Sequence, residues 1–349
     1  MDIYTRTHTR ITGILIIMII AMALGAGGCR RHEPAPAQYK DTRVLMGTTV
    51  TITLYGASEA ELEQAADAAF AEIERLSAVF SRYDPESELS RLNREAVDGG
   101  THEVSPEMAA MLARCVALCH ATGGAFDITV GPLSAVWRQA RESGEPPAET
   151  HIRNALGKMG CDKIRVNMET NTVTLTVPGM SLDLGGIAKG FITGRAARVI
   201  ADRGVSSALI NAGGDMTALG DKPGGAPWAL GIQNPREPGD VLATISLRDA
   251  AVTTSGDYEQ FFEKNGKRES HIIDPRTGHG AAETISATVI APLAERADAL
   301  STALSVLGPD QGMAMLEKEF PGVEALIITP DRKLHYSPGF KQYLADAYQ

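Results

Sequence analysis

Cysteine is scarce in this chain, and its scarcity excludes a scaffold built on disulfides. Only four of the 349 residues are cysteine, and Cys29 lies near the N-terminus. Three further thiols are too few to cross-link a body of about 310 residues. Cys115 and Cys119 lie in an apolar segment with helical spacing, so we expect them to be buried core thiols. Their spacing before His120 is one residue longer than the C-x-x-C-H pattern of haem attachment.

Positively charged residues are also fewer than negatively charged ones. The chain has 33 lysine and arginine residues against 43 aspartate and glutamate residues, which gives a formal net charge of −10. An acidic body argues against nucleic-acid binding, because that function needs a basic patch. A bound anion would then need local cations or a metal ion to offset the overall field.

The apolar run from Ile11 to Leu24 is shorter than the roughly 20 residues of a membrane-spanning helix. It leads into Ala26-Gly27-Gly28-Cys29, a pattern similar to a lipoprotein cleavage site. We therefore expect residues 1–28 to be removed as a signal peptide and Cys29 to carry lipid. Residues 29–40 would form a flexible tether and residues 41–349 the folded domain. An ordinary secretory peptide or an uncleaved anchor is the alternative.

Periodicity predicts an α+β fold with mostly antiparallel sheets, because helices and strands mix without a regular strand–helix–strand order. Strands are expected over 50–54, 164–166, 172–177, 208–211, 228–232, 243–247, 251–255, 285–290 and 325–329. Helices are expected over 58–80, 105–122, 187–203, 295–307 and 311–319. The segment 142–150, which contains Pro146 and Pro147, is expected to be a surface loop.

The segment from Ser181 to Gly190 predicts a site for a phosphorylated ligand. Asp183 ends an apolar stretch, Gly185 and Gly186 follow, and a helix is expected to begin at once. Glycine allows a large ligand to approach the main chain. The amides at a helix N-terminus suit phosphate groups.

Asp298 and Thr302 are candidate metal ligands. They are four residues apart in a predicted helix, so their oxygens share one face. A carboxylate and a hydroxyl suit Mg²⁺ better than Zn²⁺. The helix dipole also favours Asp in a first helical turn, and Thr302 could equally be an ordinary buried hydroxyl.

His271 is the candidate general base. It precedes Ile272-Ile273 and an Asp274-Pro275 turn. A histidine in this position can accept a proton near neutral pH, or it can simply cap the end of a strand. The other histidines show no ligand spacing with it, so a zinc site is not indicated.

A further glycine-rich turn could form the floor of a pocket for a flat ring. Gly123 and Gly124 lead into Ala125-Phe126-Asp127. Met46 and Tyr83 add a thioether and a phenol that could enclose an aromatic ligand. Each of these segments alone is more typical of a core or a turn.

Together these segments resemble the FAD:protein FMN transferases, once called thiamine-biosynthesis lipoproteins. The matching stretches are Met46-Gly47-Thr48, Phe80 to Tyr83, Gly123 to Asp127 with Gly131-Pro132, Asp183 to Gly190, Asn211 to Asp215, Thr254-Ser255-Gly256, His271 to Pro275 and Asp298 to Thr302. They follow one another in the family's order, which is far more specific than any single motif.

The resemblance implies a two-lobed α+β architecture with FAD between the lobes. The residues along the FAD would be Met46, Tyr83, Gly124, Ala125, Phe126, Asp183 and Lys189, with Ile272 near it. Mg²⁺ would be held by the Gly186 carbonyl, Asp298 and Thr302. Ser301 is a further candidate ligand, because some relatives carry an aspartate at its position. Asp215 and Asp274 would orient groups nearby.

The implied reaction splits the pyrophosphate of FAD, releases AMP and joins FMN to a threonine hydroxyl of another protein, with His271 accepting the proton. Acceptors in the family are subunits of membrane redox complexes such as Na⁺-pumping NADH:quinone reductases. We therefore expect an enzyme anchored by lipid on the periplasmic side of the inner membrane. The alternatives are an FAD pyrophosphatase that yields FMN and AMP, and a non-catalytic lipoprotein that binds FAD.

Overall fold

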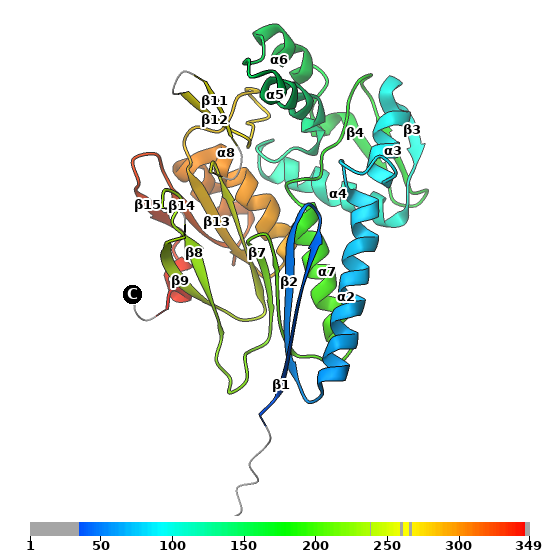
Figure 1. The fold of residues 1–349 in the computed structure, drawn as a ribbon. Coiled ribbons are helices and arrows are strands. Elements are labelled where there is room, and N and C mark those ends of the chain that lie inside the picture. The colour runs from blue at the N-terminus through cyan, green and yellow to red at the C-terminus, as the bar shows by residue number, and fades with distance from the viewer. Residues whose placement is uncertain (1–34, 238, 259–260, 265–266, 346–349) are drawn as a thin grey trace, which may run out of the picture. The chain divides into compact units, whose positions relative to one another are not determined.

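An eight-stranded sheet forms the centre of the fold, with the strand order β1-β2-β6-β7-β10-β13-β14-β15 (Figure 1). Its strands are β1 Ala37–Leu45, β2 Thr48–Gly56, β6 Ser207–Ala212, β7 Asp215–Leu219, β10 Ala250–Gly256, β13 Ser286–Ala291, β14 Glu324–Ile328 and β15 Leu334–Tyr336. Every strand pair in the described part of the chain is antiparallel. The predicted α+β fold with antiparallel sheets is confirmed.

This computed structural model describes residues 35–349 except 238, 259–260, 265–266 and 346–349. The predicted signal peptide and Cys29 therefore lie outside the described residues. Strand β1 begins at Ala37, so the last four residues of the segment predicted as a tether are strand instead. No helix in the described part of the chain has the length and hydrophobicity needed to cross a membrane.

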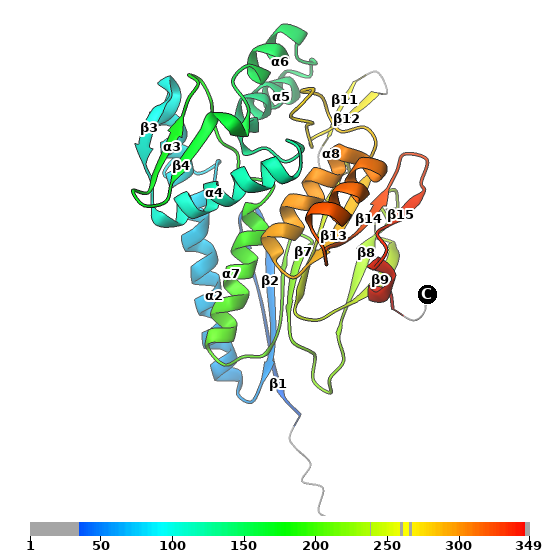
Figure 2. The ribbon, with the colours of Figure 1, turned by 180° about the vertical axis from the view of Figure 1, so that it is seen from behind.

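Three helices cover one face of the large sheet (Figure 2). They are α2 Glu59–Phe80, α7 Ala188–Asp202 and α8 Ala294–Glu319. Helix α2 buries Leu62, Phe70 and Ile73 on the side that faces the sheet, as its helical spacing of apolar residues requires. Helix α8 joins the two helices predicted over 295–307 and 311–319, with a kink where Gly308 has φ 70°.

A hairpin covers the opposite face of the sheet (Figure 1). It consists of β8 Trp228–Gln233 and β9 Val241–Leu247, and the short helix η4 Phe340–Tyr343 lies beside it. Trp228, Leu230 and Phe340 pack there against the sheet residues Leu326 and Ile328. Because both faces are covered, every residue of β13 is buried, which explains its continuous apolar and small-residue sequence.

A smaller group of elements lies between α2 and α7 in the sequence. Its members are α3 Glu88–Glu95, η1 Ala96–Asp98, β3 Gly100–Glu103, α4 Pro106–Ala121, η2 Ile128–Val130, α5 Gly131–Ser143, α6 Glu149–Leu156, η3 Cys161–Lys163, β4 Ile164–Asn167 and β5 Thr172–Leu175. The strands form a separate sheet in the order β3-β5-β4. The predicted loop over 142–150 contains the exposed link between α5 and α6. A last hairpin, β11 Phe261–Lys264 and β12 Lys267–Ser270, precedes His271.

One hydrophobic core runs through both groups of elements. It includes Val50 and Ile52 from the large sheet together with Met108, Leu112 and Val173 from the smaller group. Residues 37–349 accordingly form a single compact unit. The candidate site lies where the two groups meet along this core.

Candidate active site

The turn before α7 brings the predicted phosphate-binding and metal-binding residues together. A Cβ placed on Gly186 would stand 3.0 Å from Thr302 Oγ1 and 3.5 Å from the Phe126 ring. At Gly190, a Cβ would stand 2.3 Å from the Ala294 carbonyl oxygen and 2.7 Å from Asp298 Cβ. Glycine at these positions therefore lets the start of α7 lie directly against α8.

The oxygen atoms gathered at this contact fit a hard cation. The buried Asp298 carboxylate accepts a hydrogen bond of 2.8 Å from the Gly190 amide through Oδ2. Thr302 lies one turn further along α8, beside the main chain of Gly186. A carboxylate, a hydroxyl and a main-chain carbonyl are the ligand types that Mg²⁺ accepts, with water or phosphate completing its shell.

Ser301 is held by other protein groups. Its fully buried hydroxyl donates to the Asp298 carbonyl at 2.8 Å, and its Oγ lies 2.7 Å from Ser255 Oγ. These contacts link α8 to β10. They give Ser301 a structural role in holding the turn that carries Asp298.

The Asp183 carboxylate contacts both the glycine turn and Arg82. Arg82 lies in the stretch Phe80 to Tyr83, but the sequence assigned it no role. Its Oδ2 accepts from Ser134 Oγ at 2.9 Å and pairs with the guanidinium of Arg82. Its Oδ1 accepts from the Gly185 amide at 3.0 Å. Arg82 also lies over the Tyr83 ring, with 5.0 Å between the guanidinium carbon and the ring centroid. Sequence reasoning missed Ser134, which lies far from Asp183 along the chain.

Tyr83 itself is open to solvent, with 79% of its surface exposed. The structure therefore leaves this predicted ring-binding residue uncovered. Met46, at the turn between β1 and β2, packs against the hydrophobic core that also contains Ala125, Phe126 and Ile272. An exposed phenol beside an ordered core is an arrangement that can close over a flat ligand.

Lys189 and Asp215 form an ion pair at the start of α7. Lys189 Nζ lies 2.6 Å from Asp215 Oδ2, and the aspartate is only 3% exposed. Burial raises the pKa of the Asp215 carboxyl, and the adjacent ammonium opposes that shift. The glycine turn before Asp215 packs on the start of β2, where the Gly213 amide donates to the Thr49 carbonyl at 3.0 Å. Lys189 and Arg82 are cations at the candidate site, and each is paired with an aspartate carboxylate.

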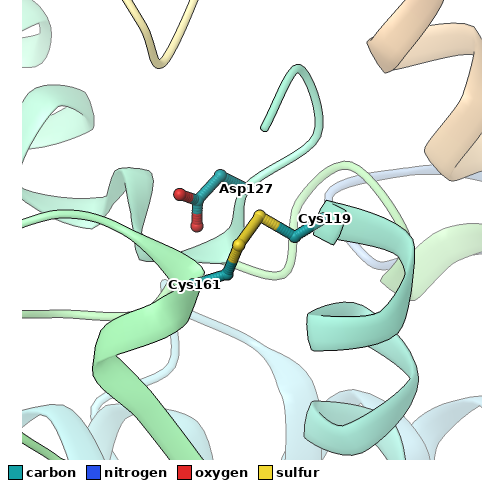
Figure 3. Close-up of side chains that lie close together, drawn as sticks. All are labelled: Cys119, Asp127 and Cys161. Carbon is teal, nitrogen blue, oxygen red and sulfur yellow. A yellow bond between two sulfur atoms is a disulfide. The ribbon is translucent and has the colours of Figure 1, made fainter. Parts of the chain in front are cut away.

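A disulfide between Cys119 and Cys161 corrects the prediction for Cys119 (Figure 3). Cys119 pairs with Cys161, whereas Cys115 is the buried free thiol that was expected. The two cysteines lie 42 residues apart on separate elements, so their pairing could not be inferred from spacing. The Cys119 carbonyl accepts from the Gly124 amide at 2.9 Å, and this backbone hydrogen bond closes the end of α4.

Asp127 lies beside this disulfide, and the three side chains are close enough to suggest a metal site (Figure 3). Both sulfurs are already bonded to each other, so they are not available as ligands. Asp127 Oδ1 accepts from the amide and the hydroxyl of Thr129, at 2.8 and 2.7 Å. Burial raises the pKa of Asp127, and these hydrogen bonds oppose the shift. Its role is to cap helix η2.

His271 is the first residue of a short loop after β12 that reverses the direction of the chain. The next residue, Ile272, is buried, and its carbonyl accepts from the Ala281 amide at 2.8 Å. His271 itself is half-buried. At the tip of the loop, Asp274 forms a two-point ion pair with Arg276, at 2.9 Å for each contact. Asp274 is therefore engaged within its own turn.

Comparison with known proteins first defines the class. The solved structure of the ApbE protein from Thermotoga maritima superposes with a TM-score of 0.81 at 32% identity, and it covers 89% of this chain and all of that chain. The flavin transferase ApbE from Vibrio cholerae superposes with a TM-score of 0.77 at 29% identity, covering 88% and all of the respective chains. The fold is therefore that of the flavin transferases.

The family follows from the sequence comparisons. The model of the ApbE family matches residues 46–327. The FAD:protein FMN transferase of Treponema pallidum is 33% identical over 345 residues, which span 94% of this chain and 93% of that protein. The enzyme of the same name from Haemophilus influenzae is 33% identical, over 90% and 92% of the two chains. The chain belongs to the ApbE family and is an enzyme.

Proposed function

We propose that this protein transfers FMN from FAD to a threonine hydroxyl of an acceptor protein and releases AMP, with Mg²⁺ bound by Asp298, Thr302 and the carbonyl of Gly186. The observation that carries this proposal is the contact of α7 with α8. There, the Gly190 amide donates to the Asp298 carboxylate and Thr302 Oγ1 lies beside Gly186, while Lys189 of the same helix pairs with Asp215. The names of the relatives support the same reaction.

FAD would lie between the large sheet and the smaller group of elements, with its ring against Met46, Ala125 and Phe126. The exposed Tyr83 would close over the ring. Lys189 would hold the pyrophosphate oxygens through its ammonium group. Pyrophosphate chemistry depends on positioning and charge neutralisation more than on covalent help, so these contacts suit the reaction.

In the proposed step, the acceptor oxygen forms a bond to the phosphorus of the FMN moiety. The bond from that phosphorus to the oxygen that leaves with AMP breaks. His271 accepts the proton of the threonine hydroxyl. A bound Mg²⁺ would neutralise charge on the phosphate oxygens. Lys189 would keep the phosphates oriented throughout, because Asp215 holds its ammonium at one end of the site.

The acceptors we propose are subunits of membrane redox complexes, such as the Na⁺-pumping NADH:quinone reductase. The enzyme would meet them on the periplasmic side of the inner membrane, tethered through Cys29. The Cys119–Cys161 disulfide supports an exported location, because such bonds persist mainly in oxidising compartments.

The test is to incubate the mature protein with FAD, Mg²⁺ and an acceptor domain that carries the target threonine, and to measure intact masses. We expect the acceptor to gain one FMN. Asp298→Asn and His271→Ala should each lower the transfer rate by about 100-fold or more. Asp310→Asn, an exposed change on the same helix, should leave the rate unchanged.

Three outcomes would contradict parts of this proposal. FAD converted to FMN and AMP with an unchanged acceptor mass would indicate a pyrophosphatase. FAD that binds but stays intact would indicate a flavin-binding lipoprotein. A His271→Ala protein with the full transfer rate would remove the histidine from the proton transfer.

A further inference from the structure

Helix α5 contacts two parts of the candidate site at once. Ser134 Oγ donates to Asp183 Oδ2 at 2.9 Å. One turn later, the indole N–H of Trp137 donates to the Gly278 carbonyl at 2.8 Å. The loop that follows β12 lies beside α5 in both views (Figures 1 and 2). A single short helix therefore joins the Asp183 turn to the loop that carries His271.

The loop from His271 to Ala281 is a hydrogen-bonded return, so its two ends move together. The Ala281 amide donates to the Ile272 carbonyl at 2.8 Å, and the Asp274 amide donates to the His279 carbonyl at 2.8 Å. Ile273 and Gly280 form a β-bridge between these two hydrogen-bonded pairs. A displacement at the Gly278 tip is therefore transmitted along paired backbone to the residue that follows His271.

The Gly278 tip of the loop packs against apolar side chains of α5 and α6. A Cβ added to Gly278 would stand 2.4 Å from Ile152 Cγ2 and 3.4 Å from Leu133 Cδ2. Leu133, Trp137 and Ile152 belong to one buried cluster, and Ile273 packs against it. Trp137 is only 4% exposed. Apolar packing holds the tip down, and the indole N–H adds a directional contact that fixes its orientation.

We propose that Trp137 is a positioning residue for His271, acting through Gly278 and the paired loop. This inference rests on the proposed transferase function, in which His271 accepts the proton of the acceptor hydroxyl. Trp137 bonds the loop carbonyl, whereas Ser134 bonds Asp183 on the side where FAD is expected to lie. Loss of the indole N–H is therefore expected to slow transfer more than it weakens FAD binding.

The test compares Trp137→Phe with a matched control. Phe keeps the aromatic packing and removes the N–H. Trp228→Phe makes the same change on β8, where the buried indole N–H has no hydrogen-bond acceptor among the described residues. For Trp137→Phe we expect a transfer rate at saturating FAD at least tenfold lower than wild type, with the FAD dissociation constant within twofold. Trp228→Phe should keep both values within twofold, and unfolding curves confirm that all proteins are folded at the assay temperature.

Hydrogen exchange provides a readout that does not depend on activity. In Trp137→Phe, the amides of Asp274 and Ala281 should exchange at least tenfold faster than in wild type, because the loop has lost its anchor. If wild type fails to modify the acceptor, the proposed function falls, and the exchange rates alone decide the role of Trp137. Wild-type transfer and wild-type exchange in Trp137→Phe would overturn the inference, as would an equal loss of rate in Trp228→Phe.

Discussion

The close contact between the two site helices α7 and α8 depends on the absence of a side chain at Gly190. A methyl group at this position would meet the Ala294 carbonyl and the Cβ of Asp298, both far inside ordinary contact distance. The backbone of α8 cannot yield cheaply, so α7 would have to move away. The same displacement would remove the hydrogen bond from the Gly190 amide to Asp298.

We therefore predict that Gly190→Ala lowers the free energy of unfolding by about 1–3 kcal/mol. Gly194→Ala is the matched control, because a Cβ there would lie 3.6 Å from Ala294 Cβ, an ordinary contact. The control should be neutral or gain up to about 1 kcal/mol from helix propensity. Urea unfolding curves measure both, and equal stability of the two variants would contradict the close contact.

At the scale of residues, the sequence revealed those contacts that depend on local spacing. The four-residue interval of Asp298 and Thr302 was enough to place both on one face of a helix. The pair of Arg82 with Asp183, and the hydrogen bond from Ser134, join residues from separate elements. Such pairs depend on how the elements pack, which no local pattern encodes.

At the scale of elements, the Cys119–Cys161 disulfide is a covalent constraint on the smaller group. It joins the end of α4 to η3, two elements that are 42 residues apart in the chain at the bonded cysteines. Closing a loop of this length restricts the unfolded chain, which typically stabilises a protein by about 2–4 kcal/mol.

The free energy of unfolding of the double variant Cys119→Ala with Cys161→Ala should therefore be about 2–4 kcal/mol lower than that of wild type. A reducing agent should lower the stability of wild type and of Cys115→Ala, but it should not affect the double variant. Chemical denaturation with and without the reductant tests this. Insensitivity of wild type to reduction would show that the bond contributes little.

Element starts were predicted well where the pattern was long and periodic, as in α2, α4 and β2. Helix α5 was not among the predicted helices, because a Gly-Pro pair such as Gly131-Pro132 is also typical of a turn. Proline is favoured in the first turn of a helix, where its missing N–H costs nothing, and α5 begins there. Strand β1 was missed, because its first four residues were assigned to the tether and no strand was predicted before residue 50.

At the scale of the whole molecule, the predicted lipid anchor is the feature that would decide where the enzyme works. We expect Cys29→Ser to move the protein from the membrane fraction to the soluble periplasmic fraction. Wild type should yield a lipid-modified N-terminal peptide by mass spectrometry. A wild-type protein found only in the soluble fraction would indicate an ordinary secretory peptide, and a Cys29→Ser protein still bound to membranes would indicate an uncleaved anchor.

The hydrophobic core that the two groups of elements share limits how FAD can enter. A hinge between separate domains would need an interface that parts, and opening this core would expose residues such as Ile52 and Met108 to water. The groups are therefore expected to stay together during turnover. FAD is then expected to enter and leave through small movements of exposed side chains such as Tyr83, rather than through opening of the two groups.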